Sequence, residues 1–286
     1  MFDSLHRNSY LYRWNASFVP AYVSPFSFHS TPPYSPLDPY QDVTYQEWMR
    51  QQVPPHAHGP ERHEERHPHL VHVDWASRFP NEVILHGPPR REVAFTFDDG
   101  PDDIWTPRIL DVLKQYDVKA TFMCVGRRIQ QHPQVLLRMI REGHIVGNHT
   151  WNHPNLTKIT LAEARLQIIR TSDEINRIAG VRPRLFRPPY GALNADVIRE
   201  LITLDYKIIF WNVDSLDWAK LTAPQVAANI LAHTRPGSII LQHSAGGVGE
   251  SLEDTVQAIP YVVETLRQGG YRIVTVPQML NISAYH

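Results

Sequence analysis

Residues 93–101 read V-A-F-T-F-D-D-G-P, an apolar run followed at once by two carboxylates. A short run rich in β-branched and aromatic residues predicts a buried β-strand, which ends at Asp98 and Asp99. Adjacent carboxylates at a strand end point in different directions, so one can bind a metal ion while the other faces a water molecule. Taken alone, D-D-G is more often a polar turn than a functional site.

Outward from this strand, apolar runs alternate with helical patterns along the rest of the chain. We expect further strands at residues 120–125, 144–147, 185–186, 206–211, 238–241 and 271–274, and a short one at 83–85. Helices are expected at residues 106–116, 133–141, 160–179, 194–204, 223–233 and 252–267. Thr106 is expected to cap the first helix, and Thr160 with Glu163 forms a capping box for the third.

Strict alternation of strands and helices predicts a parallel sheet covered by helices, either an open sheet or a barrel. Ionisable residues follow nearly every later strand, namely His149, His153, Arg187, Asp214, Asp217 and His243. An open sheet gathers ligands at one switch point, whereas all strand ends of a barrel converge on one mouth. We therefore predict an α/β fold, a distorted and incomplete (β/α) barrel of about seven strands.

The composition changes near residue 90, which indicates a boundary. Residues 1–90 hold 13 Pro, 9 His and 2 Gly, against 11 Pro, 7 His and 12 Gly in residues 91–286. We expect a largely disordered arm rich in Pro, aromatic residues and His over residues 1–82, and one barrel domain over residues 83–286. The histidines of the arm suit either a metal-binding tract or, as its prolines favour, a solvated linker.

Charge and cysteine content exclude several classes of protein. The 286 residues include 28 basic and 29 acidic side chains, a balance that argues against a nucleic-acid-binding protein. The single cysteine, Cys124, excludes an intramolecular disulfide and a cysteine-built metal site. No run approaches the roughly 20 apolar residues of a membrane helix. No secretory signal is visible near the first residue, which leaves the location open.

His149 and His153 stand four residues apart in H-T-W-N-H. On one helical turn this spacing places both imidazoles within reach of one ion, although two surface histidines would look the same. With a carboxylate they supply three protein ligands and an open position, the arrangement of a catalytic zinc-type site. Without a cysteine ligand, such a site also suits cobalt or nickel.

Three further motifs follow later strands. R-P-P-Y-G at residues 187–191 is stiff, so it holds the Arg187 side chain and the Tyr190 amide in place. D-S-L-D-W at residues 214–218 adds carboxylates and an indole, and L-Q-H at 241–243 ends a strand with His243. Each alone is explained nearly as well by a turn, a helix cap or a structural histidine. Their joint occurrence at successive strand ends favours a functional site.

These segments resemble the polysaccharide deacetylase family, the metal-dependent carbohydrate esterases that share the nodulation-factor deacetylase (NodB homology) domain. The motifs T-F-D-D-G, H-T-x-x-H, R-P-P-Y-G, D-S-x-D-W and L-x-H all stand in the family's order. The resemblance covers about residues 90–280, roughly two thirds of the chain.

The resemblance implies a role for each catalytic residue. Asp98 would be the general base and would pair with Arg187. His243 would be the general acid and would pair with Asp217. The backbone N–H of Tyr190 would help to stabilise the developing oxyanion.

The resemblance also implies a metal site and a substrate pocket. Asp99, His149 and His153 would hold one divalent ion, with zinc expected first and cobalt or nickel as alternatives. Trp218 and Leu241 would wall the pocket that receives the acetyl methyl group.

The predicted function is metal-dependent removal of N-acetyl groups from a polysaccharide that contains N-acetylglucosamine, either peptidoglycan or a chitin-like polymer. One alternative is an O-acetyl esterase of the xylan type on the same scaffold. Another is a non-catalytic surface or coat protein that uses the aromatic arm, although intact ligands argue against it. We expect a monomer whose partner is the polysaccharide, with no nucleic acid and no membrane span. The substrate class suggests action at the cell envelope, the spore or outside the cell.

Overall fold

The computed structural model describes residues 74–247 and 249–286. The expected arm falls outside the described residues up to residue 73, so its disorder and its boundary with the domain stay predictions. The described chain opens with helix α3 (Trp75–Arg78), and Trp75 and Phe79 pack against a hydrophobic cluster of the domain. Packed residues therefore already precede the expected boundary at residue 83.

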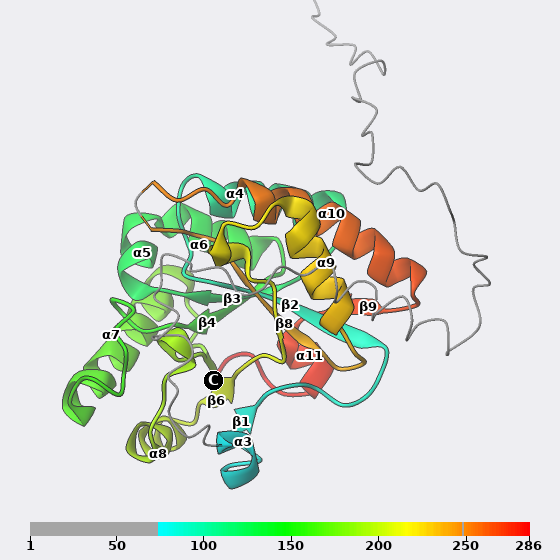
Figure 1. The fold of residues 1–286 in the computed structure, drawn as a ribbon. Coiled ribbons are helices and arrows are strands. Elements are labelled where there is room, and N and C mark those ends of the chain that lie inside the picture. Colours follow the sequence, from blue (N-terminus) through cyan, green and yellow to red (C-terminus); the bar gives the residue numbers. More distant parts are fainter. Residues whose placement is uncertain (1–73, 248) are drawn as a thin grey trace, which may run out of the picture. The chain divides into compact units, whose positions relative to one another are not determined.

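One parallel sheet forms the centre of the fold (Figure 1). Its strand order is β1-β6-β5-β4-β3-β2-β8-β7, with β9 also paired to β2. The strands are β1 (Val83–Ile84), β2 (Glu92–Asp98), β3 (Thr121–Cys124), β4 (Ile145–Asn148), β5 (Leu185–Phe186), β6 (Lys207–Ile209), β7 (Val213–Asp214), β8 (Ile239–His243) and β9 (Arg272–Val274). The prediction of an incomplete (β/α) barrel is confirmed.

The barrel closes through the chain between β6 and β7, not through strand pairing. β6 pairs with β5 and β7 pairs with β8, although only residues 210–212 separate them. The strand expected at residues 206–211 is present as β6 but ends at Ile209, and β7 was not expected. The ladder of β6 is interrupted because the buried Arg187 guanidinium takes the carbonyls of Ile209 and Phe210 at 2.9 and 3.0 Å.

Helices flank the sheet, and α4, α9 and α10 lie together on one side of it (Figure 1). The helices are α4 (Trp105–Gln115), α5 (Gly126–Gln131), α6 (Pro133–Arg141), α7 (Leu161–Ala179), α8 (Ala195–Thr203), α9 (Ala223–His233), α10 (Glu253–Gln268) and α11 (Val276–Leu280). The six expected helices are present. The short helices α5 and α11 were not expected, because one or two turns leave little periodicity to detect.

The caps of two helices show one correct and one wrong prediction. The box of Thr160 and Glu163 forms at the start of α7 as expected. Thr106, however, does not cap α4, since it lies inside the helix and its hydroxyl donates to the Ser244 carbonyl at 2.7 Å. Asp102 Oδ1 accepts the first free N–H groups of α4 instead, at 2.7 to 3.2 Å.

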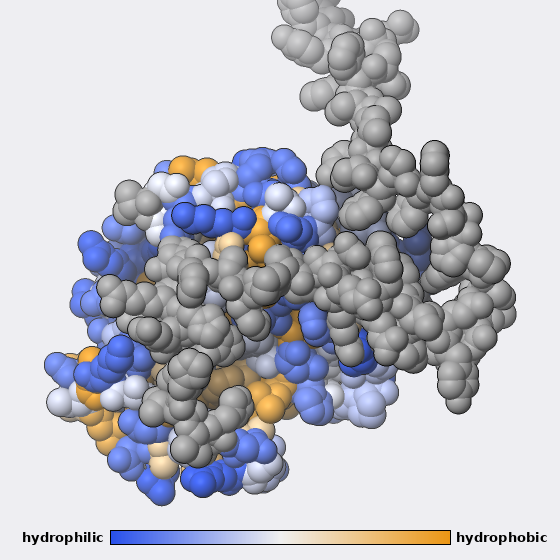
Figure 2. All heavy atoms as spheres, in the orientation of Figure 1, coloured by the Kyte–Doolittle hydropathy of each residue, from blue (hydrophilic) through white to orange (hydrophobic). Residues whose placement is uncertain are grey.

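The core lies between the sheet and its helices, where strand β2 is buried along nearly its whole length. Where described residues are visible in Figure 2, hydrophilic residues dominate the surface and hydrophobic ones form small groups. None of the helices between residues 74 and 286 is long and apolar enough to cross a membrane. Strand β2 is long and buried, so it gives Asp98 and Asp99 at its end a rigid support.

Candidate active site

Asp98 and Asp99 lie at the carboxyl end of the central strand β2. Asp98 is its last residue and is 4% exposed. Asp99 has a φ of 73°, a left-handed conformation that is costly for a residue other than glycine. The backbone turns there, so the two adjacent carboxylates have different neighbours.

Arg187, which follows strand β5, holds the Asp98 carboxylate. Its fully buried guanidinium donates to Asp98 Oδ1 at 2.7 Å and to Thr96 Oγ1 at 2.8 Å. Its other donors go to the carbonyls of Ile209, the last residue of β6, and of Phe210. A charge that is removed from water is tolerated when it is paired and hydrogen-bonded in this way. One Asp98 oxygen is thereby fixed, and the other faces His149 Nε2 at 3.7 Å.

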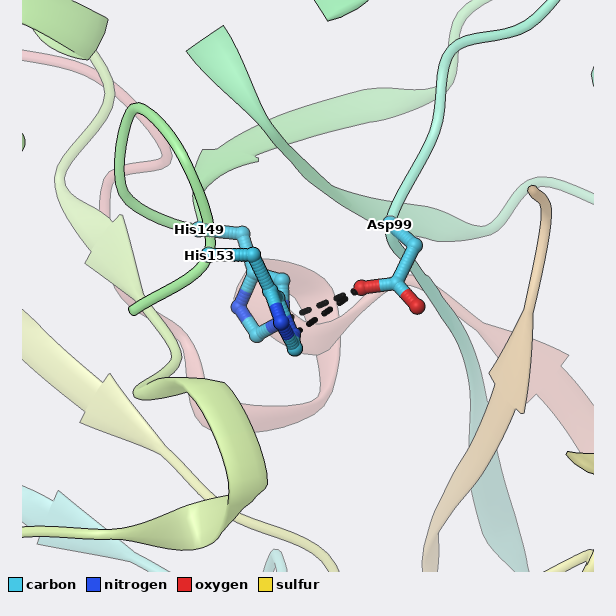
Figure 3. A group of neighbouring side chains, drawn as sticks. All are labelled: Asp99, His149 and His153. Atoms are coloured by element: carbon cyan, nitrogen blue, oxygen red, sulfur yellow. Dashed lines mark ion pairs between the residues drawn. The ribbon is translucent and has the colours of Figure 1, made fainter. Parts of the chain in front are cut away.

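Asp99, His149 and His153 form a compact cluster, which we call the Asp–His–His cluster. Their ligand atoms lie within 4.8 Å of one another. Asp99 Oδ1 is 3.5 Å from His149 Nε2 and 3.2 Å from His153 Nε2, and both imidazoles point toward this carboxylate (Figure 3). The sequence prediction that these three residues meet in space agrees with this geometry.

The loop that carries the two histidines differs from the expected helical turn. Residues 149–153 are not helical, and Thr150 and His153 have positive φ. Gln167 Oε1 of α7 accepts the N–H groups of Trp151 and Asn152 at 2.9 and 2.8 Å. A tight loop pinned to α7 therefore brings both rings to one point.

The electrostatics of the cluster fit a bound cation. Burial raises the pKa of Asp99, but the nearby charges of His153, His243 and His149 outweigh it, so this pKa lies well below its usual range. Asp99 Oδ1 is buried without a hydrogen-bond partner among the described residues. His149 Nδ1 donates to the Arg187 carbonyl at 2.7 Å, which turns the lone pair of Nε2 toward Asp99. Two imidazoles and one carboxylate are a donor set that zinc-type ions prefer.

A second charged pair, Asp217 with His243, lies at the end of β8. Asp217 Oδ1 accepts from His243 Nδ1 at 2.7 Å, and Asp217 Oδ2 accepts the His243 backbone N–H at 2.8 Å. Burial raises the pKa of Asp217, but the charge and hydrogen bonds of His243 outweigh it and hold this pKa below its usual range. The pair leaves the Nε2 edge of His243 directed away from Asp217.

Four of the ten predicted site residues line a cavity of about 590 Å³. Asp99, His153, Trp218 and His243 line it. The 2% exposed Leu241 is not among the lining residues.

Tyr190 and Trp218 lie beside the charged groups of the site. Tyr190 has a positive φ, and its ring lies edge-on to that of His153 at 4.7 Å. The Trp218 indole N–H donates to Asp214 Oδ1 at 3.4 Å.

The structure adds residues to the site that motif reasoning missed. Thr255 of α10 donates its hydroxyl to Asp217 Oδ2 at 3.1 Å, and Arg127 and Arg128 of α5 line the cavity. Thr255 lies in an ordinary amphipathic helix, so no sequence signal marks it. The adjacent arginines come after Gly126, just beyond the strand expected at residues 120–125, and that position near a strand end was an available signal.

Ionisable side chains from the ends of successive parallel strands converge on one mouth, as they do in barrel enzymes. The fold and the site thus define an enzyme of the α/β-barrel class.

Comparison with known proteins narrows this class. The family model described as polysaccharide deacetylase matches residues 86–209. A peptidoglycan-N-acetylglucosamine deacetylase of Bacillus cereus is 41% identical over 210 residues, which are 73% of this chain and 75% of the relative. A chitooligosaccharide deacetylase of Bradyrhizobium is 36% identical, over 66% of this chain and 90% of the relative. A crystal structure of a peptidoglycan N-acetylglucosamine deacetylase matches with a TM-score of 0.72 and 40% identity, over 74% of this chain and 99% of that one. The chain belongs to the polysaccharide deacetylase family.

Proposed function

We propose that this deacetylase removes N-acetyl groups from N-acetylglucosamine residues of peptidoglycan or of a chitin-like polymer, with the help of one divalent metal ion. The observation that carries the proposal is the meeting of three groups at one mouth: the Asp–His–His cluster, the Asp98–Arg187 pair and the Asp217–His243 pair. All three come from one chain, so the site needs no second copy, and we propose that the enzyme acts as a monomer.

Asp99, His149 and His153 would hold the ion, with zinc expected first and cobalt or nickel as alternatives. When bound, a divalent ion supplies Lewis acidity, which lowers the pKa of water and polarises the acetamido carbonyl. A hydrogen bond to the His149 ring supports this role. The Arg187 carbonyl accepts it from Nδ1 and so orients the ring.

Asp98 is the proposed general base. Its Oδ1 is occupied by Arg187, so Oδ2, which faces the Asp–His–His cluster, is the oxygen that accepts a proton from the attacking water. The fixed ion pair keeps the carboxylate from turning. A positioned base of this kind typically contributes about 10²–10⁴ in rate.

His243 is the proposed general acid. Its Nδ1 is bonded to Asp217, so Nε2 is the nitrogen that delivers a proton to the leaving amine. The backbone N–H of Tyr190 is proposed to stabilise negative charge that develops on the acetamido oxygen. Trp218 and Leu241 are proposed to receive the acetyl methyl group. The cavity-lining position of Trp218 supports its part in this pocket.

Metal removal and restoration test this proposal. A chelator removes metal from the purified full chain, and Zn²⁺ or Co²⁺ is then added. Acetate release is measured from chitooligosaccharides, peptidoglycan and acetylated xylan. We expect metal-dependent release from chitooligosaccharides or peptidoglycan, and a metal-dependent rise in Tm that His153→Asn loses. Release from none of the glycans would refute the proposal, and release from acetylated xylan alone would identify an O-acetyl esterase instead.

A further inference from the structure

Two adjacent arginines face the same cavity as the catalytic groups. Arg127 and Arg128 lie in the first turn of α5, directly after strand β3, and both line the 590 Å³ cavity with His132. They share that space with Asp99 and His243. We call Arg127 and Arg128 the arginine wall. A substrate whose acetamido group reaches the site therefore passes this wall.

The backbone places the arginine wall firmly. The Gly126 N–H donates to the Thr150 carbonyl at 2.9 Å, and the Arg127 N–H donates to the Trp151 carbonyl at 3.0 Å. These bonds join α5 to the loop that carries the site's two histidines. The Arg128 guanidinium donates to the Gly246 carbonyl at 2.6 Å, across the cavity mouth. The wall is thus tied to both sides of the site.

The arginine wall forms no ion pair with a carboxylate of the described residues. Arg108, Arg138 and Arg184, by contrast, each have an acidic partner. The cavity's other carboxylate outside the Asp–His–His cluster, Glu250, accepts the Gly247 N–H at 2.7 Å. Arg127 and Arg128 thus bring two positive charges to a cavity whose two carboxylates, Asp99 and Glu250, both have other partners.

We infer that the arginine wall is a subsite for a carboxylate carried by the sugar next to the one that is deacetylated. Arginine is suited to this role because its planar fork of N–H groups matches a carboxylate. A cavity of 590 Å³ has room for more than one sugar ring. A chitin-like chain bears no carboxylate, whereas every second sugar of a peptidoglycan strand bears a lactyl group, which is a free carboxylate where no stem peptide is attached. The inference rests on the proposed function and selects peptidoglycan strands without stem peptides from its two substrates.

A matched pair of substrates tests the subsite. One is an oligosaccharide of alternating N-acetylglucosamine and N-acetylmuramic acid with free lactyl carboxylates, and the other is the same oligosaccharide with these groups converted to primary amides. For the wild type we expect a KM about 10-fold lower for the free acid with kcat similar, because the contact is made equally in ground and transition states. Raising the ionic strength should reduce this preference.

Substitutions test whether Arg127 and Arg128 cause the preference for the free acid over the amide. Arg127→Gln with Arg128→Gln should abolish it, so that the ratio of the KM values for the amide and the free acid falls from about 10 to about 1. Arg127→Gln alone should weaken it and leaves the Arg128–Gly246 contact intact. Arg141→Gln removes an exposed arginine outside the cavity and should change nothing.

Two results would overturn the inference. They are a wild type that treats the acid and the amide alike, and a double variant that keeps the full preference. Calorimetric binding of both oligosaccharides to the wild type and the double variant gives a readout independent of turnover. If the wild type releases no acetate from either, the proposed function fails, and the binding difference still decides whether the subsite exists.

Discussion

At the residue scale, Arg187 connects most parts of the site. Its buried guanidinium holds Asp98, its other donors take the carbonyls that end strand β6, and its own carbonyl orients His149. The resemblance in the sequence implied only the contact with Asp98. The remaining contacts depend on backbone carbonyls, which have no sequence signature.

Asp98→Asn tests the assignment of the general base. The substitution keeps the shape of the side chain but removes the carboxylate that would accept a proton. We expect kcat to fall by about 10²–10⁴ while metal content stays nearly unchanged, because Asp98 lies outside the Asp–His–His cluster. Acetate release and metal analysis measure the two effects. The exposed Asp103→Asn serves as control, and full activity of Asp98→Asn would show that another group is the base.

Thr255→Val tests whether α10 positions the proposed acid. The change removes the hydroxyl that donates to the buried Asp217 Oδ2. A lost hydrogen bond to a charged group costs about 1.5–3 kcal/mol, so we expect lower stability together with a several-fold lower kcat and little change in KM. Urea unfolding and steady-state kinetics measure these quantities. Thr255→Ser should restore both, and a normal kcat in the valine variant would remove Thr255 from the mechanism.

At the element scale, the buried strands and the longer helices were predictable, whereas the short helices α5 and α11 were not. The buried runs around β2, β3 and β8 and the capping box of α7 are strong local signals. Helix α5 has six residues and is stabilised by bonds to the loop of residues 149–153, a partner distant in sequence. Tertiary contacts of this kind override local propensity.

Gly126→Ala tests how closely α5 packs against that loop. A Cβ at residue 126 would lie 2.4 Å from Trp151 Cε3 and 2.6 Å from Thr171 Oγ1. Overpacking of this kind costs about 1–3 kcal/mol, and displacement of Trp151 should also lower acetate release because it lies between the two histidines. Thermal unfolding and activity are measured beside Gly269→Ala, whose nearest atoms are 3.4 Å away or more. Equal stability of both variants would contradict the tight contact.

At the scale of the whole molecule, pH-dependent stability should reflect a buried neutral histidine. His144 is 2% exposed, accepts the Ala120 N–H at Nδ1 and lies edge-on to Phe122. Burial lowers its pKa from 6.5 to about 4. The folded chain therefore resists protonation of His144. The contribution of His144 to the free energy of unfolding is present in full above pH 6.5 and is lost as the pH falls toward 4. The loss amounts to about 3 kcal/mol.

Urea unfolding from pH 7 to pH 4 measures this contribution by comparison with His144→Asn. The asparagine side chain can still accept the Ala120 N–H but does not titrate. We expect the free energy of unfolding to fall more steeply with acidification in the wild type than in the variant, since all other titrating groups are shared. Parallel pH profiles for the two proteins would show that His144 does not resist protonation in the folded state.

The sequence by itself determined the class of fold, the positions of the main strands along the chain and the residues of the Asp–His–His cluster. These features are local, because hydrophobic periodicity marks each element and the chemistry stands directly at its end. Only the tertiary structure decided how the barrel closes between β6 and β7, where the arginine wall faces, and that Thr255 contacts Asp217 across 38 positions. These contacts join segments far apart in the chain, so they arise from packing around one sheet and from the need to pair each buried charge.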